Sequence, residues 1–168
     1  MTDKPPTKPP AATQSQTSAT STDAAPRPGK RSGFRTLVGY HALDWREGYA
    51  EMELDLAETH MNSNGTTHGG VVMTIIDAAM GHAATWCSVP GHARYCATMS
   101  LTTSFLVPPR QGDRLRAVGR LISIDHRVAT CVAEARNQSG EIVAVAQASF
   151  RYATGSEHVE GVPRRPHR

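Results

Sequence analysis

The sequence HMNSNGTTHGG, residues 60–70, runs directly into VVMTIIDAAMGHAATW, residues 71–86. The first part is polar and contains three glycines, which is typical of a loop. In the second part, apolar residues fall on one stripe at helical spacing, namely Val72, Ile75, Ile76, Ala79 and Ala83. The pattern predicts a loop followed by one long helix. The alanines on the stripe indicate that another element packs closely against this helix.

Strand-like runs lie on both sides of this segment. Residues 49–56 alternate apolar and charged side chains, a period of two that predicts a half-buried strand. After a break at 88–92, four more strand-like runs follow, over residues 96–107, 114–124, 128–137 and 142–152. Because the breaks between them are short, we expect consecutive strands to be antiparallel neighbours. Residues 34–43 are expected to open the domain as a short helix or strand. The order predicts an α+β domain whose single long helix is segregated from the strands.

Two segments flank this domain, which is expected to span residues 33–153. Residues 1–32 are rich in Pro, Ser and Thr and contain no Val, Ile, Leu or Phe, so they predict a disordered tail that cannot offset its ordering entropy by burial. A mitochondrial transit peptide fits less well, because the first arginine is Arg27 and the prolines interrupt any amphipathic helix. Residues 154–168 are expected to be a flexible basic tail.

Composition excludes several classes of protein. The net charge is +3 and the aromatic content 5%, and the isoelectric point is about 9.0. The positive charge lies partly at the two ends, which favours solvated tails and no nucleic-acid partner. Three widely spaced cysteines argue against a disulfide framework or a zinc knuckle and favour a reducing, cytoplasmic setting. No apolar stretch approaches the roughly 18 residues that a membrane span needs.

The quoted segment also contains a motif with fixed spacing. It consists of Asn62, Gly65, the run His68-Gly69-Gly70, and Asp77 on the helix. The motif resembles the signature of the PaaI-type (4HBT) acyl-CoA thioesterases of the hotdog-fold superfamily. The likeness extends over about residues 47–152 and includes the segments SFLVP, 104–108, and GEIVAVA, 140–146. His-Gly-Gly alone would be a weak signal, but several residue types at fixed offsets are specific.

The resemblance implies a fold, a reaction and an assembly. The fold would be a hotdog, an antiparallel sheet wrapped around one long central helix. The reaction would be hydrolysis of an acyl-CoA thioester to free acid and CoA, without a metal or organic cofactor, on aryl-acetyl or medium-chain acyl groups. The assembly would be a homodimer or homotetramer with its sites at the subunit interface.

The resemblance also implies roles for individual residues. Asp77 would act as general base on water or as nucleophile, and the Gly69 N–H would be the oxyanion donor. Asn62 would orient water or thioester from the partner subunit, His68 would hold the loop or contact the leaving thiol, and Thr98 aligns with a hydroxyl near the water. Residues expected to contact substrate are Gly65, Gly70, Met73 and Met80.

Physical chemistry agrees with two of these roles. The first N–H groups of a helix are unpaired and lie at the positive end of its dipole, so the Gly69 amide suits an oxyanion. On the helix, Asp77 shares its side with Met73, Met80 and Ala84. Apolar surroundings disfavour the charged form of a carboxylate and make it a better proton acceptor.

Simpler interpretations and other functions stay open. Asp77 could face solvent, Asn62 could simply form a turn, and His68 could be structural; His82 and His92 are expected to be structural. An enoyl-thioester hydratase or dehydratase on the same fold would use a His with a carboxylate. A non-catalytic acyl-CoA-binding protein would be expected to lose the carboxylate or the oxyanion glycine, and both are present here.

Overall fold

The computed structural model describes residues 33–165, so the predicted disorder of residues 1–32 lies outside the described part. The described elements follow in chain order, with a short 3₁₀ turn, Glu58–His60, before α2: α1 Gly33–Val38, β1 His41–Arg46, β2 Tyr49–Asp55, α2 Gly69–Thr85, β3 His92–Ala93, β4 Cys96–Phe105, β5 Arg114–Asp125, β6 Val128–Arg136, β7 Ile142–Tyr152 and β8 Val162–Pro163. The predicted long helix and the four later strands are confirmed to within a few residues. The segment expected as one short element at 34–43 is instead a helix followed by the start of a strand.

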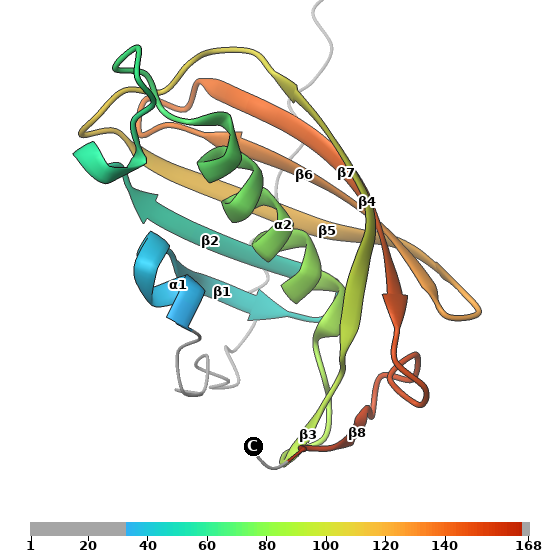
Figure 1. Ribbon diagram of the computed structural model, residues 1–168. Coiled ribbons are helices and arrows are strands. Elements are labelled where there is room, and N and C mark those ends of the chain that lie inside the picture. The colour runs from blue at the N-terminus through green and yellow to red at the C-terminus, as the bar shows by residue number, and fades with distance from the viewer. Residues whose placement is uncertain (1–32, 166–168) are drawn as a thin grey trace, which may run out of the picture.

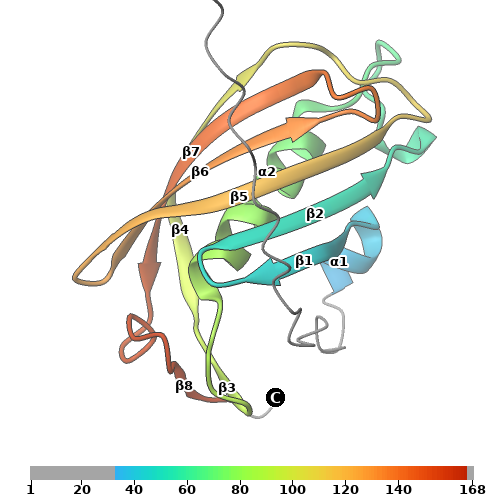
Figure 2. The ribbon, with the colours of Figure 1, turned by 180° about the vertical axis from the view of Figure 1, so that it is seen from behind.

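Six of the strands form one antiparallel sheet in the order β1-β2-β5-β6-β7-β4. The sheet curves around α2, which lies along one of its faces (Figure 1). No helix of residues 33–165 covers the opposite face (Figure 2). A single long helix held in the concave side of an antiparallel sheet is the hotdog arrangement. The predicted fold class is therefore confirmed.

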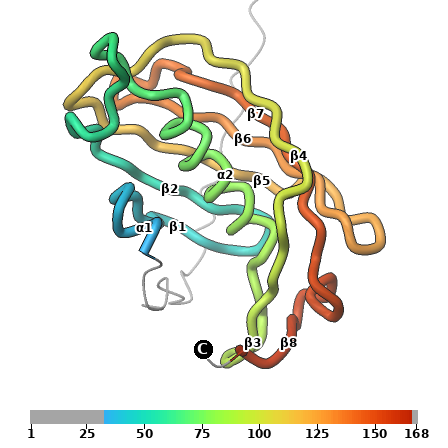
Figure 3. Tube along the Cα trace, viewed as in Figure 1, coloured from blue at the N-terminus to red at the C-terminus, as the bar shows by residue number. Residues whose placement is uncertain are grey.

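One expectation about the sheet is wrong. Strands β5, β6 and β7 pair in sequence order, but β4 does not pair with β5. Strand β4 lies at the sheet edge beside β7, and β5 pairs instead with β2. The connecting residues 106–113 cross the N-terminal end of α2 to reach the far side of the sheet (Figure 3). A short break therefore joins distant strands here, because the link spans the helix end rather than forming a hairpin.

Helix α2 buries the stripe that its sequence pattern predicts. All five stripe residues are at most 1% exposed. The helix and the sheet come very close at Gly119 on β5, where an added Cβ would lie 2.4 Å from the backbone carbon of Ala79. Only glycine allows this approach, so the middle of the helix is fixed directly against the sheet.

The expected flexible tail at 154–168 is wrong for residues 154–165. Strand β8 pairs with β3, and Ser156 is fully buried. The Arg94 guanidinium donates to the backbone carbonyls of Ser156, at 2.9 Å, and Glu157, at 3.1 Å. The segment has few large apolar residues, so backbone pairing and one buried arginine hold it, and neither shows in hydrophobic periodicity. Residues 166–168 lie outside the described part.

Within the described chain, no helix combines the length and the apolar character that crossing a membrane would require.

Candidate active site

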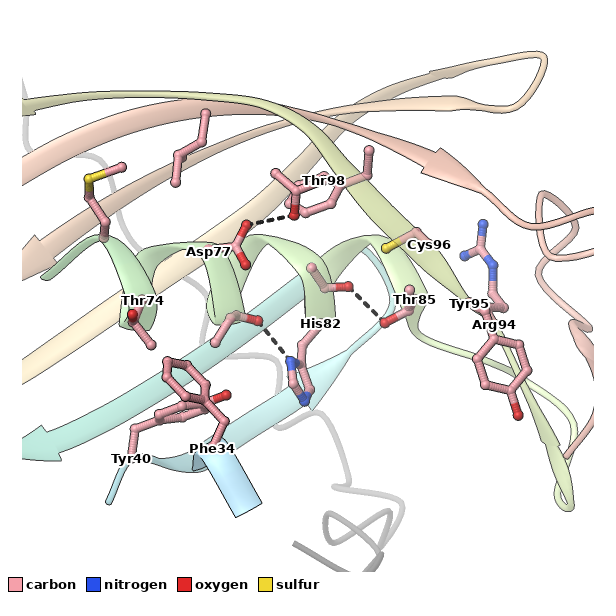
Figure 4. Close-up of a pocket in the computed structure, with 15 residues that line it drawn as sticks. Phe34, Tyr40, Thr74, Asp77, His82, Thr85, Arg94, Tyr95, Cys96 and Thr98 are labelled. Atoms are coloured by element: carbon pink, nitrogen blue, oxygen red, sulfur yellow. Dashed lines mark hydrogen bonds between the residues drawn. The ribbon is translucent and has the colours of Figure 1, made fainter. Parts of the chain in front are cut away.

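Asp77 lies in the middle of α2 and is half-buried. Its Oδ1 accepts a hydrogen bond of 2.9 Å from the hydroxyl of Thr98 on β4, and Figure 4 shows the two side chains pointing toward one another across a cavity. The cavity has a volume of about 520 Å³. It is lined by Phe34, Tyr40, Met73, Thr74, Asp77, Ala78, Gly81, His82, Thr85, Arg94, Tyr95, Cys96, Thr98, Leu101 and Phe150. The interpretation of Asp77 as a solvent-facing surface residue is therefore not favoured.

The Cys96 thiol and the Tyr40 phenol are ionisable groups that line this cavity together with Asp77. Burial raises the pKa of the Cys96 thiol to about 11, with a further increase from the charge of Asp77 and a decrease from Arg94. Burial also raises the pKa of Tyr40, which Arg35 lowers and Asp77 raises. The thiol and the phenol therefore stay protonated near neutral pH. Among the described residues that line the cavity, Asp77 is the one carboxylate.

The start of α2 has the geometry expected for an anion-binding amide. His68 is the N-cap residue, and its Nδ1 accepts a hydrogen bond of 2.9 Å from the Gly70 N–H. An added Cβ on Gly70 would lie 3.0 Å from this Nδ1, and one on Gly69 would lie 3.4 Å from the Phe105 ring. His68 thus caps the helix, which is a structural role. As the first residue of the helix, Gly69 has an N–H with no acceptor within the helix.

Asn62 organises the loop before α2. Its Oδ1 accepts from the backbone N–H groups of Asn64 and Thr66, at 2.9 and 3.2 Å, and its Nδ2 donates to the Thr66 hydroxyl at 2.9 Å. Gly65 follows with a φ of +73°, a conformation that favours glycine. Within one chain, Asn62 and Gly65 act as turn formers, the simpler interpretation of these residues.

The predicted site residues fall into two separate groups. Gly69 and Asp77 are eight positions apart on one helix (77 − 69), about 12 Å at a rise of 1.5 Å per residue. One chain therefore does not bring the amide and the carboxylate onto a single carbonyl carbon. The structure gathers Asp77, Thr98 and Met73 at the cavity and keeps the loop and cap residues at the N-terminal end of the helix.

The prediction that Met80 contacts substrate is wrong within this chain. Met80 is fully buried in the core between helix and sheet and is absent from the lining of the cavity. Three residues beyond Asp77, a helical residue is rotated by about 300°, and at this position the side chain lies among the buried core residues.

Sequence reasoning missed most of the cavity wall. Phe34 and Tyr40 come from the start of the domain, and Arg94 and Tyr95 from the segment before β4. No spacing rule links these positions to Asp77, because only the folded sheet brings them together. A resemblance limited to residues 47–152 also leaves Phe34 and Tyr40 outside it.

His82 is a structural residue, as expected. Its Nδ1 lies 2.7 Å from the Ala78 carbonyl oxygen, and its ring packs edge-on to Trp45. Burial lowers the pKa of His82, so the imidazole is neutral near pH 7. Figure 4 shows Asp77 and His82 leaving opposite sides of α2, an arrangement that does not form a His–carboxylate pair.

The described residues contain no group of three His, Cys, Asp or Glu side chains able to hold a metal ion.

The arrangement around Asp77 permits two kinds of chemistry. A carboxylate fixed by a hydroxyl in a largely apolar cavity can accept a proton from water or attack a carbonyl carbon.

Comparison with known proteins identifies the family. The model of the thioesterase superfamily matches residues 64–144. The Pseudomonas aeruginosa protein named "Putative esterase PA0474" is 35% identical over 98 residues, 58% of this chain and 70% of the relative. An Archaeoglobus fulgidus protein named "Putative esterase" is 22% identical over 111 residues, which cover 66% of this chain and 69% of the relative.

Two solved structures share the fold. The PaaI protein of E. coli superposes with a TM-score of 0.65 and 23% identity, covering 73% of this chain and 86% of the other. The Streptococcus mutans protein smu.793, solved bound to acetyl CoA, superposes with a TM-score of 0.61 and 18% identity, covering 74% and 91%. The P. aeruginosa relative and the family match together show that the chain belongs to the thioesterase superfamily, and the expected enzyme class, a thioester hydrolase, is confirmed.

Proposed function

We propose that this protein hydrolyses acyl-CoA thioesters with aryl-acetyl or medium-chain acyl groups, giving the free acid and CoA. Asp77 is the general base or the nucleophile, and the Gly69 N–H is the oxyanion donor. The observation that carries the proposal is the Asp77 carboxylate, held by Thr98 at 2.9 Å in a cavity that no other acid lines among the described residues.

In the base-catalysed route, Asp77 removes a proton from water as the oxygen attacks the thioester carbonyl carbon. In the nucleophilic route, an Asp77 oxygen attacks that carbon directly, and water then cleaves the resulting anhydride. In both routes the carbonyl oxygen gains negative charge, which an unpaired amide at a helix start stabilises. The CoA thiolate leaves and takes up a proton.

The working unit in this proposal is at least a homodimer. The Gly69 amide and Asp77 of one chain are about 12 Å apart along α2, too far to act on the same carbonyl group. A second copy that presents its own helix start to Asp77 would complete the site. Asn62 would then act across the interface, and its amide keeps one N–H beyond the one given to Thr66.

The proposal that CoA is the thiol of the substrate is supported by structures with the same fold. Acetyl CoA is bound in the S. mutans structure, and coenzyme A in a Streptococcus pneumoniae structure described as a hypothetical thioesterase. Both share only the fold with this chain. They support CoA as the carrier and leave the acyl group to be chosen by the cavity, whose wall includes Phe34, Tyr40 and Phe150.

A thiol-release assay tests the proposal. Wild type is screened against phenylacetyl-, hexanoyl-, decanoyl- and palmitoyl-CoA, with Asp77→Asn and Asp77→Ala measured beside it. We expect turnover of at least one aryl or medium-chain substrate and its loss in both variants, with unchanged thermal unfolding. Full activity in either variant removes Asp77 from the mechanism. Hydration of crotonyl-CoA without thiol release would instead identify a hydratase.

A further inference from the structure

A second cavity adjoins the one that holds Asp77. Its volume is about 240 Å³, and it shares three lining residues with the larger cavity: His82, Thr85 and Arg94. It lies at the C-terminal end of α2, between Trp45 on β1 and the paired strands β3 and β8. None of the residues assigned to the proposed reaction, Asp77, Thr98 and Gly69, lines this second cavity.

The second cavity is cationic. Arg94 and Arg164 line it, and no Asp or Glu does so among the described residues. The guanidinium of Arg164 donates to the carbonyl of His92 at 3.2 Å. Within the described part of the chain, no carboxylate lies within 4.0 Å of either arginine. The positive charge of this cavity is therefore not neutralised by an ion pair.

Arg94 is the unusual member of the pair, because it is only 8% exposed. Three of its N–H groups are taken by carbonyl oxygens, including that of Trp86 at 3.1 Å, and two remain. The nearby Glu157 carboxylate does not pair with it, and its buried Oε2 has no partner in the described structure. Burying a cation without a counterion is costly, so a site of this kind favours an anionic ligand.

The other walls suit an organic acid. Trp45 and Trp86 supply apolar surface, and burial lowers the pKa of His82, which is therefore neutral near pH 7. A ligand that extends from the Asp77 cavity into this one would pass Arg94, which lines both cavities, and reach Arg164, which lines only the second. The planar guanidinium group of arginine binds a carboxylate through two parallel hydrogen bonds. A carbon chain that ends in a carboxylate would therefore fit both the apolar surface and the arginines.

Resting on the proposed function, we propose that the second cavity binds a carboxylate at the far end of the acyl group. The preferred substrates are then ω-carboxyacyl-CoA thioesters, the monothioesters of dicarboxylic acids. Asp77 and Thr85 are eight residues apart on α2, about 12 Å. Carbon–carbon bonds of about 1.5 Å in a zigzag need roughly ten carbons for that span, which indicates a diacid of medium length.

The test compares substrates of equal length with and without the second carboxylate. The values of kcat/KM for sebacoyl-CoA and decanoyl-CoA are measured for wild type, Arg164→Gln and Arg164→Lys. Arg151→Gln is the matched control, since Arg151 is exposed and lines neither cavity. We expect wild type to prefer sebacoyl-CoA about tenfold or more. Arg164→Gln should lose most of this preference, while Arg164→Lys retains part of it and Arg151→Gln all of it.

Two results overturn the inference while leaving the proposed function intact. One is hydrolysis of decanoyl-CoA by wild type with no preference for the diacid. The other is an Arg164→Gln variant whose kcat/KM falls equally for sebacoyl-CoA and decanoyl-CoA but does not fall for decanoyl-pantetheine. That result would assign the arginine to binding of the CoA phosphates. Calorimetric binding of sebacate and decanoate needs no turnover. Tighter binding of sebacate that Arg164→Gln abolishes supports the subsite even if CoA esters are not the substrate.

Discussion

The Thr98 hydroxyl donates a hydrogen bond to Oδ1 of Asp77 across 2.9 Å, which joins the edge strand β4 to the middle of α2. The contact restricts the rotation of the carboxylate and leaves Oδ2 with no hydrogen bond from the described residues. An acid that is oriented before substrate arrives needs less reorganisation in the transition state.

Removing this hydroxyl should slow the chemical step. A hydrogen bond to a charged group contributes about 1.5–3 kcal/mol, so we expect Thr98→Val to lower kcat by about 10- to 100-fold, with little change in KM. Thr98→Ser keeps the donor and should stay near wild type. Steady-state thiol release on the best acyl-CoA measures both variants. Equal kcat for Val and Ser would show that the contact has no part in catalysis.

The N–H donor of Gly69 can be removed by substitution with little disturbance of the helix. Proline is well tolerated at the first helical position, and the preceding His68 already has the φ of −63° and ψ of 128° that a following proline requires. Gly69→Ala is the matched control, because alanine also places a Cβ 3.4 Å from the Phe105 ring but keeps the N–H. We expect Gly69→Pro to lose about 10²–10³ in kcat relative to Gly69→Ala. Equal rates, with both proteins folded by circular dichroism, would remove this amide from the mechanism.

Cys96 lines the active-site cavity but should be unreactive. With a pKa of about 11, raised first by burial, only about one thiol in a thousand is ionised at pH 8. The thiolate is the reactive form, so alkylation by iodoacetamide should be slow and should accelerate about tenfold for each pH unit up to about 10. Peptide mass spectrometry on Cys87→Ser, which removes the other half-buried thiol, follows the reaction. Rapid labelling of Cys96 at pH 7 with loss of activity would contradict this.

The fold could be predicted because its periodicities are local. The α2 stripe and the alternation of β2 follow from which side chains meet the core within one element. The pairing of β4 with β7 depends on where the 106–113 link travels, which no local pattern records. The C-terminal segment also escaped prediction, since one buried side chain, Arg94, holds it where an apolar stripe would be expected.

The candidate site was predicted in part for a similar reason. A motif at fixed spacing pointed to Asp77, and the likeness over the strands pointed to Thr98, which the structure joins by a hydrogen bond. Met80 was wrongly placed, because proximity on a helical wheel does not say which flank of Asp77 faces the sheet. The role of Asn62 across an interface stays a prediction, since in one chain it bonds within its own loop.

The close approach of Gly119 to the backbone of α2 gives a test of how this helix is held. An added Cβ at Gly119 would lie 2.4 Å from the Ala79 backbone carbon and 2.6 Å from the Met80 nitrogen. Backbone atoms cannot rotate away as a side chain can, so α2 must move. We expect Gly119→Ala to lower the free energy of unfolding by about 3 kcal/mol, at the upper end of overpacking costs. Urea denaturation measures it.

The same shift should reach the active site, because Asp77 lies two residues before Ala79 on the displaced helix. Alanine suits a strand at least as well as glycine does, so a loss of stability in Gly119→Ala reports the helix contact and not strand propensity. Gly33→Ala is the control: its added Cβ meets nothing within 4 Å, and its stability and kcat should stay near wild type. At temperatures where Gly119→Ala is fully folded, its kcat should still fall several-fold. Wild-type stability and kcat in this variant would mean that α2 can slide along the sheet, and the fixed distance between Asp77 and Thr98 would then not be maintained by packing.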